Sequence, residues 1–273
     1  MSEPALDAQR FLQGADMSEV ELAPFVGGEL AWFSASCPES DSANQDAAAL
    51  LPIGPAAAVL AVADGAGGGR SGALAAGLAV RALGEALEEG QREGFLPRTA
   101  ILNGFERANA AVCALGVGAA TTLAVAEIRE ARMRPYHVGD SLILLVGQRG
   151  KVKLETVSHS PVGFAVEAGV LDERDALHHQ DRHLVSNILG AQDMRIEMGS
   201  ERPFAPRDTL LIASDGLSDN LHVREIAEHL RCGSLRDAAE ALAATARRRM
   251  YAPRSDEPSK VDDLTLLVFR RSR

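Results

Sequence analysis

Apolar residues in the first half of the chain follow two successive patterns. Short runs rich in Val, Leu, Trp and Phe come first and are typical of buried strands. They occupy residues 29–36, 47–53 and 57–64. Ala- and Leu-rich stretches with helical spacing follow at 71–90 and 98–115. The first half therefore predicts three strands and then two helices.

The second half contains further strand-like runs, and those between residues 120 and 157 have short connections. The runs occupy residues 120–128, 134–140, 141–147, 151–157, 195–200, 208–214 and 263–270. Short connections favour antiparallel pairing, because parallel strands need a crossover of a dozen or more residues. Residues 160–194 read as short helices and loops, and helices are expected at 222–230 and 234–250.

These elements predict one α+β domain at residues 29–273, with antiparallel sheets covered on the outside by helices. No internal repeat or low-complexity linker divides the chain. Residues 1–28 have mixed polarity and end in two glycines, so we expect an N-terminal extension that packs loosely or carries a short helix.

One glycine-rich stretch, VADGAGGGRSG at 62–72, matches a dinucleotide-binding fingerprint in spacing. Gly67, Gly69 and Gly72 fit G-x-G-x-x-G between a strand-like and a helix-like segment. That fold needs another strand directly after the helix, whereas this chain continues into a second helix. Asp64 would also point its charge toward a pyrophosphate. The dinucleotide interpretation is therefore disfavoured.

Composition and charge exclude other classes of protein. The formal net charge is −10, which disfavours binding to a nucleic-acid backbone. Three scattered cysteines form no C-x-x-C pair, so neither a disulfide framework nor a zinc-thiolate site is expected. The N-terminus lacks the pattern of a signal peptide and no apolar stretch is long enough to span a membrane. We expect a cytoplasmic protein without nucleic-acid or membrane partners.

Aspartates stand at the ends of the predicted strands. Asp64, Asp140 and Asp215 follow strands next to glycines, whereas Asp46 and the Asp262-Asp263 pair precede strands. The start of one antiparallel strand lies beside the end of its neighbour, so these carboxylates are expected at one edge of the molecule.

Such a set of like charges needs a counter-charge. The sequence shows no Lys/Arg cluster beside these acids, so a hard divalent cation, Mg²⁺ or Mn²⁺, is the natural solution. The Gly65 carbonyl would be a further ligand. The alternative is that each Asp-Gly pair is only a turn.

Eight motifs follow one another along the chain: NQDA (44–47), VADGAGG (62–68), GAATTL (118–123), HVGDS (137–141), SHSPVGFAVEAGVLDERDA (158–176), HLVSNILGA (183–191), LLIASDGLSDN (210–220) and DDLTLLV (262–268). In this order they resemble the metal-dependent protein Ser/Thr phosphatases of type 2C, the PPM family, in their compact bacterial form. The resemblance implies a four-layer α-β-β-α sandwich of two antiparallel sheets. It also implies a site for two, or even three, Mg²⁺ or Mn²⁺ ions at one end.

The resemblance also assigns roles to residues of this chain. Asp64 would bridge two metal ions, and the Gly65 carbonyl, Asp215 and Asp262 would complete their coordination. Asp46 would act through metal-bound water, and Asp140 would help to hold a further ion. Hydroxide bridging the two metals would then attack a phosphoserine or phosphothreonine without a covalent phosphoenzyme.

Several positions depart from the family pattern. Asp41 stands where the family usually has a phosphate-gripping arginine, and Leu142 stands where an arginine commonly follows Gly-Asp-Ser. Arg70 and Arg182 are candidate replacements for the phosphate contact, or else solvated surface arginines. His137 is either a general acid near the site or a packed strand residue.

The main hypothesis is therefore a phosphatase whose substrate is a protein phosphorylated by a Ser/Thr kinase. A non-catalytic module of the same fold that recognises a partner is the first alternative, motivated by Asp41 and Leu142. A phosphatase with an unusual phosphate substrate is the second.

Overall fold

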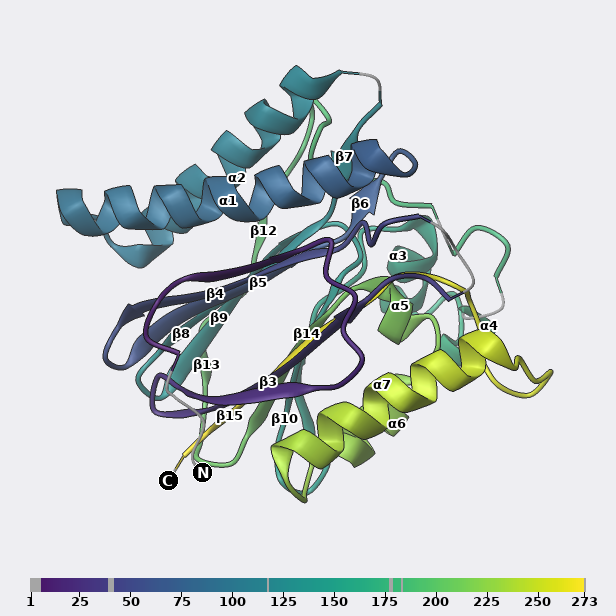
Figure 1. Cartoon of the computed structure of the whole chain (residues 1–273). Helices are drawn as coiled ribbons and strands as arrows, with labels where there is room; N and C mark the ends of the chain where they lie inside the picture. The colour runs from purple at the N-terminus through teal and green to yellow at the C-terminus, as the bar shows by residue number, and fades with distance from the viewer. Residues whose placement is uncertain (1–5, 39–41, 117, 177–178, 183, 273) are drawn as a thin grey trace.

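Two antiparallel sheets packed face to face form the centre of the molecule (Figure 1). The computed structural model describes residues 6–38, 42–116, 118–176, 179–182 and 184–272. The first sheet has the strand order β1-β4-β5-β8-β9-β12, and β13 also pairs with β9. Its strands are β1 (Arg10–Gln13), β4 (Ala47–Gly54), β5 (Ala57–Ala63), β8 (Leu123–Arg129), β9 (Arg132–Val138), β12 (Glu197–Met198) and β13 (Arg202–Pro203).

The second sheet has the order β11-β10-β14-β15-β3-β2. Its strands are β2 (Glu21–Phe25), β3 (Gly28–Ala35), β10 (Leu142–Val146), β11 (Val152–Glu155), β14 (Thr209–Ala213) and β15 (Leu264–Arg271). A short ribbon of β6 (Gly65–Ala66) and β7 (Ala120–Thr121) continues beyond the first sheet.

Helices cover the outer faces of both sheets. The pair α1 (Arg70–Glu93) and α2 (Pro97–Leu115) lies on the first sheet, and the pair α6 (Val223–Leu230) and α7 (Leu235–Tyr251) lies on the second (Figure 1). Three short helices, α3 (Pro161–Glu167), α4 (Glu173–Ala176) and α5 (Asp215–Ser218), lie at one end of the sandwich (Figure 1). The predicted four-layer α-β-β-α architecture is confirmed.

Each interface between layers is an apolar core. Between the sheets, Trp32, Leu60 and Phe269 are almost fully buried together with Ile143 and Leu210. Alanines at the face of α1 allow this helix to lie close to the first sheet. Burial on both faces explains why the central strands are continuous apolar runs rather than alternating ones.

The N-terminal segment differs from the expectation. Residues 10–13 and 21–25 form edge strands, one in each sheet, rather than a loose extension or a short helix. Edge strands are exposed along one side, so their sequences have mixed polarity. This mixed polarity is why the sequence pattern did not predict them as strands. The strand expected at 195–200 is also reduced to the two residues of β12.

Among the residues that the structure describes, no helix combines the length and apolar character needed to cross a membrane.

Candidate functional site

The register of the first sheet places two of the predicted aspartates side by side. Ala47 of β4 pairs with Ala63 of β5, so Asp46 and Asp64 lie immediately beyond this pair at the same end of the sheet. Ser214, which follows β14 in the second sheet, donates a hydrogen bond from Oγ to Asp46 Oδ2 at 2.7 Å. Asp46 therefore links the two sheets at this end.

The second sheet brings its aspartates to the same end. Leu142 of β10 pairs with Ala213 of β14, so Asp140 and Asp215 both lie two residues beyond this pair. Asp262 lies two residues before the start of β15, the other neighbour of β14. The structure thus brings together the predicted carboxylates at one end of the sandwich.

The electrostatics of this cluster are unfavourable without a cation. Burial raises the pKa of Asp64 well above its usual value, and the charges of Asp215, Asp46, Asp140 and Asp262 raise it further. Burial, followed by Asp215 and Asp219, raises the pKa of Asp140 to about 7. Shifts of this kind mark carboxylates that repel one another, and a bound cation would remove the repulsion.

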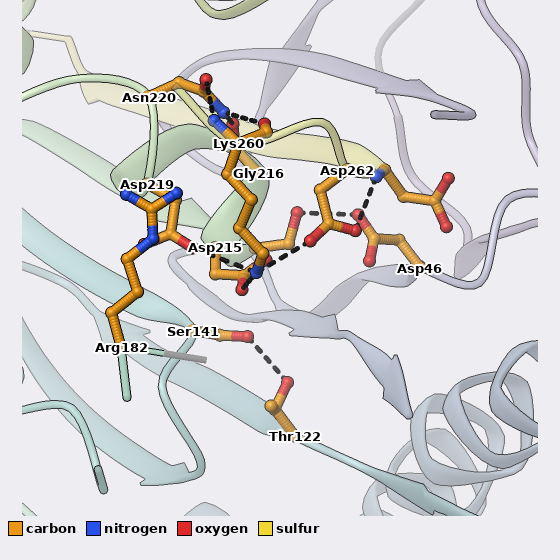
Figure 2. A network of polar contacts seen from close by, with 12 residues as sticks. Asp46, Thr122, Ser141, Arg182, Asp215, Gly216, Asp219, Asn220, Lys260 and Asp262 are labelled. Atoms are coloured by element: carbon orange, nitrogen blue, oxygen red, sulfur yellow. Dashed lines mark hydrogen bonds and ion pairs between the residues drawn. The ribbon is translucent and has the colours of Figure 1, made fainter. Parts of the chain in front are cut away.

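The backbone of Asp64 is held in place from both directions. Its N–H donates to Thr122 Oγ1 at 2.9 Å, and its carbonyl accepts hydrogen bonds from Thr122 N and Thr121 Oγ1. Thr122 Oγ1 in turn lies 2.7 Å from Oγ of Ser141, the residue after Asp140 (Figure 2). The positions of Asp64 and Asp140 are therefore coupled through two hydroxyl groups.

Close backbone approaches at the site require glycine at two positions. A Cβ on Gly65 would collide with the carbonyls of Gly72 and Gln45, and a Cβ on Gly216 would collide with the carbonyl of Asp263. The glycines after Asp64 and Asp215 therefore let other segments of chain pass directly against the carboxylate-bearing turns.

The two adjacent acids at 262 and 263 have different environments. Asp263 is buried and accepts hydrogen bonds from the backbone N–H groups of Cys37 and Gln45 at 2.6 and 2.7 Å. Asp262 is one-third exposed and carries its charge into the cluster. Asp263 therefore positions the segment before Asp46.

A lysine lies in the middle of the cluster, and the sequence analysis overlooked it. Lys260 Nζ lies 2.5 Å from Asp215 Oδ2, 3.0 Å from Asp219 Oδ2 and 2.9 Å from Asp262 Oδ2 (Figure 2). The expectation that no basic side chain neutralises these acids is wrong for this part of the cluster. A single lysine supplies the counter-charge that a search for a Lys/Arg cluster missed.

The sequence analysis overlooked Asp219 as well as Lys260, and the spacing of both residues from the predicted aspartates could have identified them. Asp219 follows Asp215 by four residues across a helical turn, which puts the two side chains on one face. Lys260 precedes Asp262 by two residues in an extended segment, which points the side chains the same way.

The carboxylates present fit a pair of hard divalent cations. Asp46 Oδ1, Asp215 Oδ1 and Asp219 Oδ2 are buried and have no hydrogen-bond donor among the described residues, although Asp219 Oδ2 makes an ion pair with Lys260. Buried polar atoms without a partner are rare and need an explanation such as a bound ion. The ligand atoms that these residues offer to an ion are all oxygens, and Mg²⁺ and Mn²⁺ prefer oxygen ligands.

A cavity of about 360 Å³ opens beside the carboxylates. Asp140, Asp215 and Asp219 form one wall, and the segments around α3 and Arg182 form another. Arg182 donates from Nη2 to the carbonyl of Ser259 at 2.9 Å. The cavity is therefore a compartment with carboxylates and a guanidinium on its surface.

The other candidate phosphate contact lies elsewhere. Arg70 is the exposed first residue of α1 and does not line this cavity. Asp41 lies outside the described residues. Leu142 is buried in β10 and lines the cavity, where it leaves an apolar patch next to Asp140.

His137 is a packed residue. It is 2% exposed, its Nε2 lies 2.9 Å from the Val157 carbonyl, and its ring stacks on His159 at 4.3 Å. Burial, together with His159, lowers its pKa. The ligand atoms of His137, His159 and Glu197 lie within 4.8 Å of one another. His159 Nδ1 accepts from Gly139 N, so its Nε2 carries the proton and donates to Glu197 at 3.1 Å, and His137 Nε2 donates to the Val157 carbonyl. These histidines form a hydrogen-bonded support under the Asp140 turn.

Three further histidines, His178, His179 and His183, belong to the segment at 160–194. His179 is exposed and lies 4.0 Å from the Asp181 carboxylate. His178 and His183 lie outside the described residues.

Comparison with known proteins gives one consistent result. The family model described as Protein phosphatase 2C matches residues 35–250. The serine/threonine phosphatase stp of Listeria innocua is 28% identical over 223 residues, which cover 78% of this chain and 84% of that protein.

Solved structures show the same fold. The serine/threonine phosphatase of S. agalactiae superimposes with a TM-score of 0.76 at 26% identity, over 89% of this chain and 99% of that one. The catalytic domain of the phosphatase PstP, solved in complex with two manganese ions, gives a TM-score of 0.68 at 24% identity, over 89% and 98%.

Proposed function

The chain belongs to the protein phosphatase 2C family, and on that premise we propose that it hydrolyses phosphoserine and phosphothreonine in proteins with the help of divalent cations. The observation that carries the proposal is the convergence of Asp46, Asp64, Asp140, Asp215 and Asp262 at one end of the sandwich, where Asp140 and Asp215 line a cavity. Among the described residues, three buried carboxylate oxygens of this cluster, of Asp46, Asp215 and Asp219, lack a hydrogen-bond donor.

We assign the ion-binding roles as follows. Asp64, the Gly65 carbonyl, Asp215 and Asp262 bind Mg²⁺ or Mn²⁺ directly, and Asp46 supports them through water. Asp140 takes part in holding the ions on the side of the cavity. When bound, two divalent cations supply a nucleophile from water at neutral pH and neutralise the phosphoryl group.

The remaining parts of the site orient the substrate. The cavity is wide enough for a phosphorylated side chain, and Arg182 supplies a planar guanidinium at its wall. Its position favours Arg182 over Arg70 as the phosphate contact. Leu142 and Val162 give the same cavity apolar surface for the carbon atoms of the substrate.

Proteins phosphorylated by a Ser/Thr kinase are the proposed substrates. The relatives named serine/threonine phosphatase support this class. We further propose that the protein acts in the cytoplasm.

The test combines a metal titration with an activity panel. Protein stripped of metal is titrated with Mn²⁺ by calorimetry and then assayed on a phosphothreonine peptide, a phosphoserine peptide and an aryl phosphate. We expect Mn²⁺ binding and Mn²⁺-dependent phosphate release. Binding without turnover on any phosphoester would instead favour a non-catalytic recognition module, and the lack of binding would contradict the proposal as a whole.

A further inference from the structure

Lys260 makes three ion pairs with carboxylates of the site, and nothing in the proposed function uses it. A lysine ammonium has three N–H donors. Lys260 Nζ has three carboxylate partners, Asp215, Asp219 and Asp262, at 2.5, 3.0 and 2.9 Å. The contact with Asp215 is a hydrogen bond and the other two are ion pairs, so the charge of Lys260 is directed at these three carboxylates.

The backbone that carries this lysine is fixed on both sides. Asn220 is fully buried; its Oδ1 accepts from Lys260 N at 3.0 Å, and its Nδ2 donates to Lys260 O at 2.8 Å. The same Nδ2 donates to Gly216 O, one residue after Asp215 (Figure 2). One asparagine thus ties the lysine to the turn that carries its carboxylate partner.

The carboxylate oxygens are divided into two sets. Lys260 takes the Oδ2 atoms of Asp215, Asp219 and Asp262. Among the described residues, Oδ1 of Asp215 and Oδ1 of Asp46 are buried without a hydrogen-bond donor, and Asp219 Oδ2 has only its ion pair with Lys260. The ammonium therefore neutralises one side of the cluster and leaves oxygens on the other side for divalent ions.

We infer that the Lys260 ammonium takes the place of one divalent ion that the Oδ2 atoms of Asp215, Asp219 and Asp262 would otherwise bind, while the Oδ1 atoms of Asp215 and Asp262 face the ions of the proposed function. The inference rests on the proposed function, because it presumes that the other carboxylate oxygens hold metal. A divalent cation cannot share the same three oxygens with an ammonium at 2.5–3.0 Å, because the two positive charges would repel each other at contact distance. The lysine consequently reduces the number of ions that the site holds.

Replacing the lysine tests this directly. Lys260→Met keeps much of the side-chain volume and removes the charge, so the variant should bind one more Mn²⁺ per chain than the wild type, measured by calorimetry and by elemental analysis of the equilibrated protein. Lys260→Arg keeps a cation and should bind the wild-type number. Lys153→Met is the matched control, because Lys153 pairs with Asp208 away from the carboxylate cluster.

The two possible failures can be told apart. A wild-type protein that binds no Mn²⁺ contradicts the proposed function. A wild-type protein that binds Mn²⁺ in the same number as Lys260→Met overturns the role of Lys260, whatever happens to the affinity.

A second measurement uses the unmodified chain and does not depend on the folding of a variant. The chain has three lysines, Lys151, Lys153 and Lys260, so acetylation of each can be followed by mass spectrometry. Exposed Lys151 should react readily, whereas Lys260 should stay protected both without metal and with saturating Mn²⁺. An increase in Lys260 acetylation on adding Mn²⁺ would show that the ions displace the ammonium, and would overturn the inference.

Discussion

Single residues at the strand ends determine the chemistry of this site, and the adjacent residues Asp262 and Asp263 have different roles. Asp262 adds charge to the cluster and accepts a hydrogen bond only from the next residue's N–H, whereas Asp263 accepts the N–H groups of Cys37 and Gln45 from another segment. An acceptor that is removed from buried donors costs about 1–3 kcal/mol. The two positions therefore separate ion binding from local stability.

We expect Asp263→Ala to lower the free energy of unfolding by about 1–3 kcal/mol, because Cys37 N and Gln45 N lose their acceptor. Asp262→Ala should change the stability of the metal-free protein by less than about 1 kcal/mol, because the loss of its ion pair with Lys260 is offset by the relief of its repulsion with Asp215. The same variant should weaken Mn²⁺ binding. Urea unfolding and calorimetry measure the two effects. Equal loss of stability in both variants would refute this division.

Asp140 makes the stability of the metal-free protein depend on pH. Its pKa is about 7 in the folded chain and near 3.8 in its usual state, so folding retains a proton between these values. The free energy of unfolding should therefore fall as pH rises from about 4 to about 7. Asp64 and Asp46, whose pKa values are also raised, act with the same sign.

Asp140→Asn should make this decline shallower, because its amide does not titrate. Glu240→Gln, on the exposed side of α7, is the control and should keep the wild-type slope. Thermal or urea unfolding between pH 5 and 8 in the presence of a chelator measures the slope. A metal-free protein that becomes more stable across this range would contradict the electrostatic description of the site.

At the scale of elements, the segment that contains α3, α4 and Arg182 forms the wall of the cavity opposite the carboxylates. Its anchor is His159, whose backbone N–H donates to Gly139 O and whose Nδ1 accepts from Gly139 N at 3.1 Å. The wall is thus attached to the same turn that carries Asp140. Substrate contacts from this segment should affect binding more than turnover.

We predict that Arg182→Ala raises KM for a phosphothreonine peptide about tenfold with a smaller change in kcat, because it removes a phosphate contact and not an ion ligand. Arg182→Lys should restore part of the affinity through its charge alone. Arg70→Ala is the comparison variant and should change KM less than about twofold. Steady-state kinetics at saturating Mn²⁺ measure KM and kcat for the three variants. A larger rise in KM for Arg70→Ala than for Arg182→Ala would instead assign the phosphate contact to Arg70 of α1.

The long elements were predictable from the sequence, and the short ones were not. The apolar runs of β3, β4, β5, β14 and β15 and the two helices α1 and α2 lie within a few residues of their predicted positions. The edge strands β1 and β2 were not predicted, because one exposed side gives them mixed polarity. The strands β12 and β13 have only two residues each, which is too short for a recognisable pattern.

At the scale of the whole molecule, the sequence predicts the positions of the long strands and their antiparallel pairing. It does not predict the order of the strands in the sheets. β5 pairs with β8 across the two helices, and β3 pairs with β15 from the opposite end of the chain. Such pairing depends on which apolar faces fit together, which local periodicity does not encode. The meeting of the aspartates followed from antiparallel geometry and the family motifs, whereas the three contacts of Lys260 needed side-chain positions.

The central claim is that these aspartates hold the divalent ions that carry out phosphoester hydrolysis. The most direct test compares phosphate release from a phosphothreonine peptide by the wild type and by Asp64→Asn over a range of Mn²⁺ concentrations. We predict Mn²⁺-dependent release by the wild type and a loss of at least about a hundredfold in the variant, since its amide cannot stabilise the ions that supply the nucleophile. An Asp64→Asn variant that responds to Mn²⁺ as the wild type does would contradict this account.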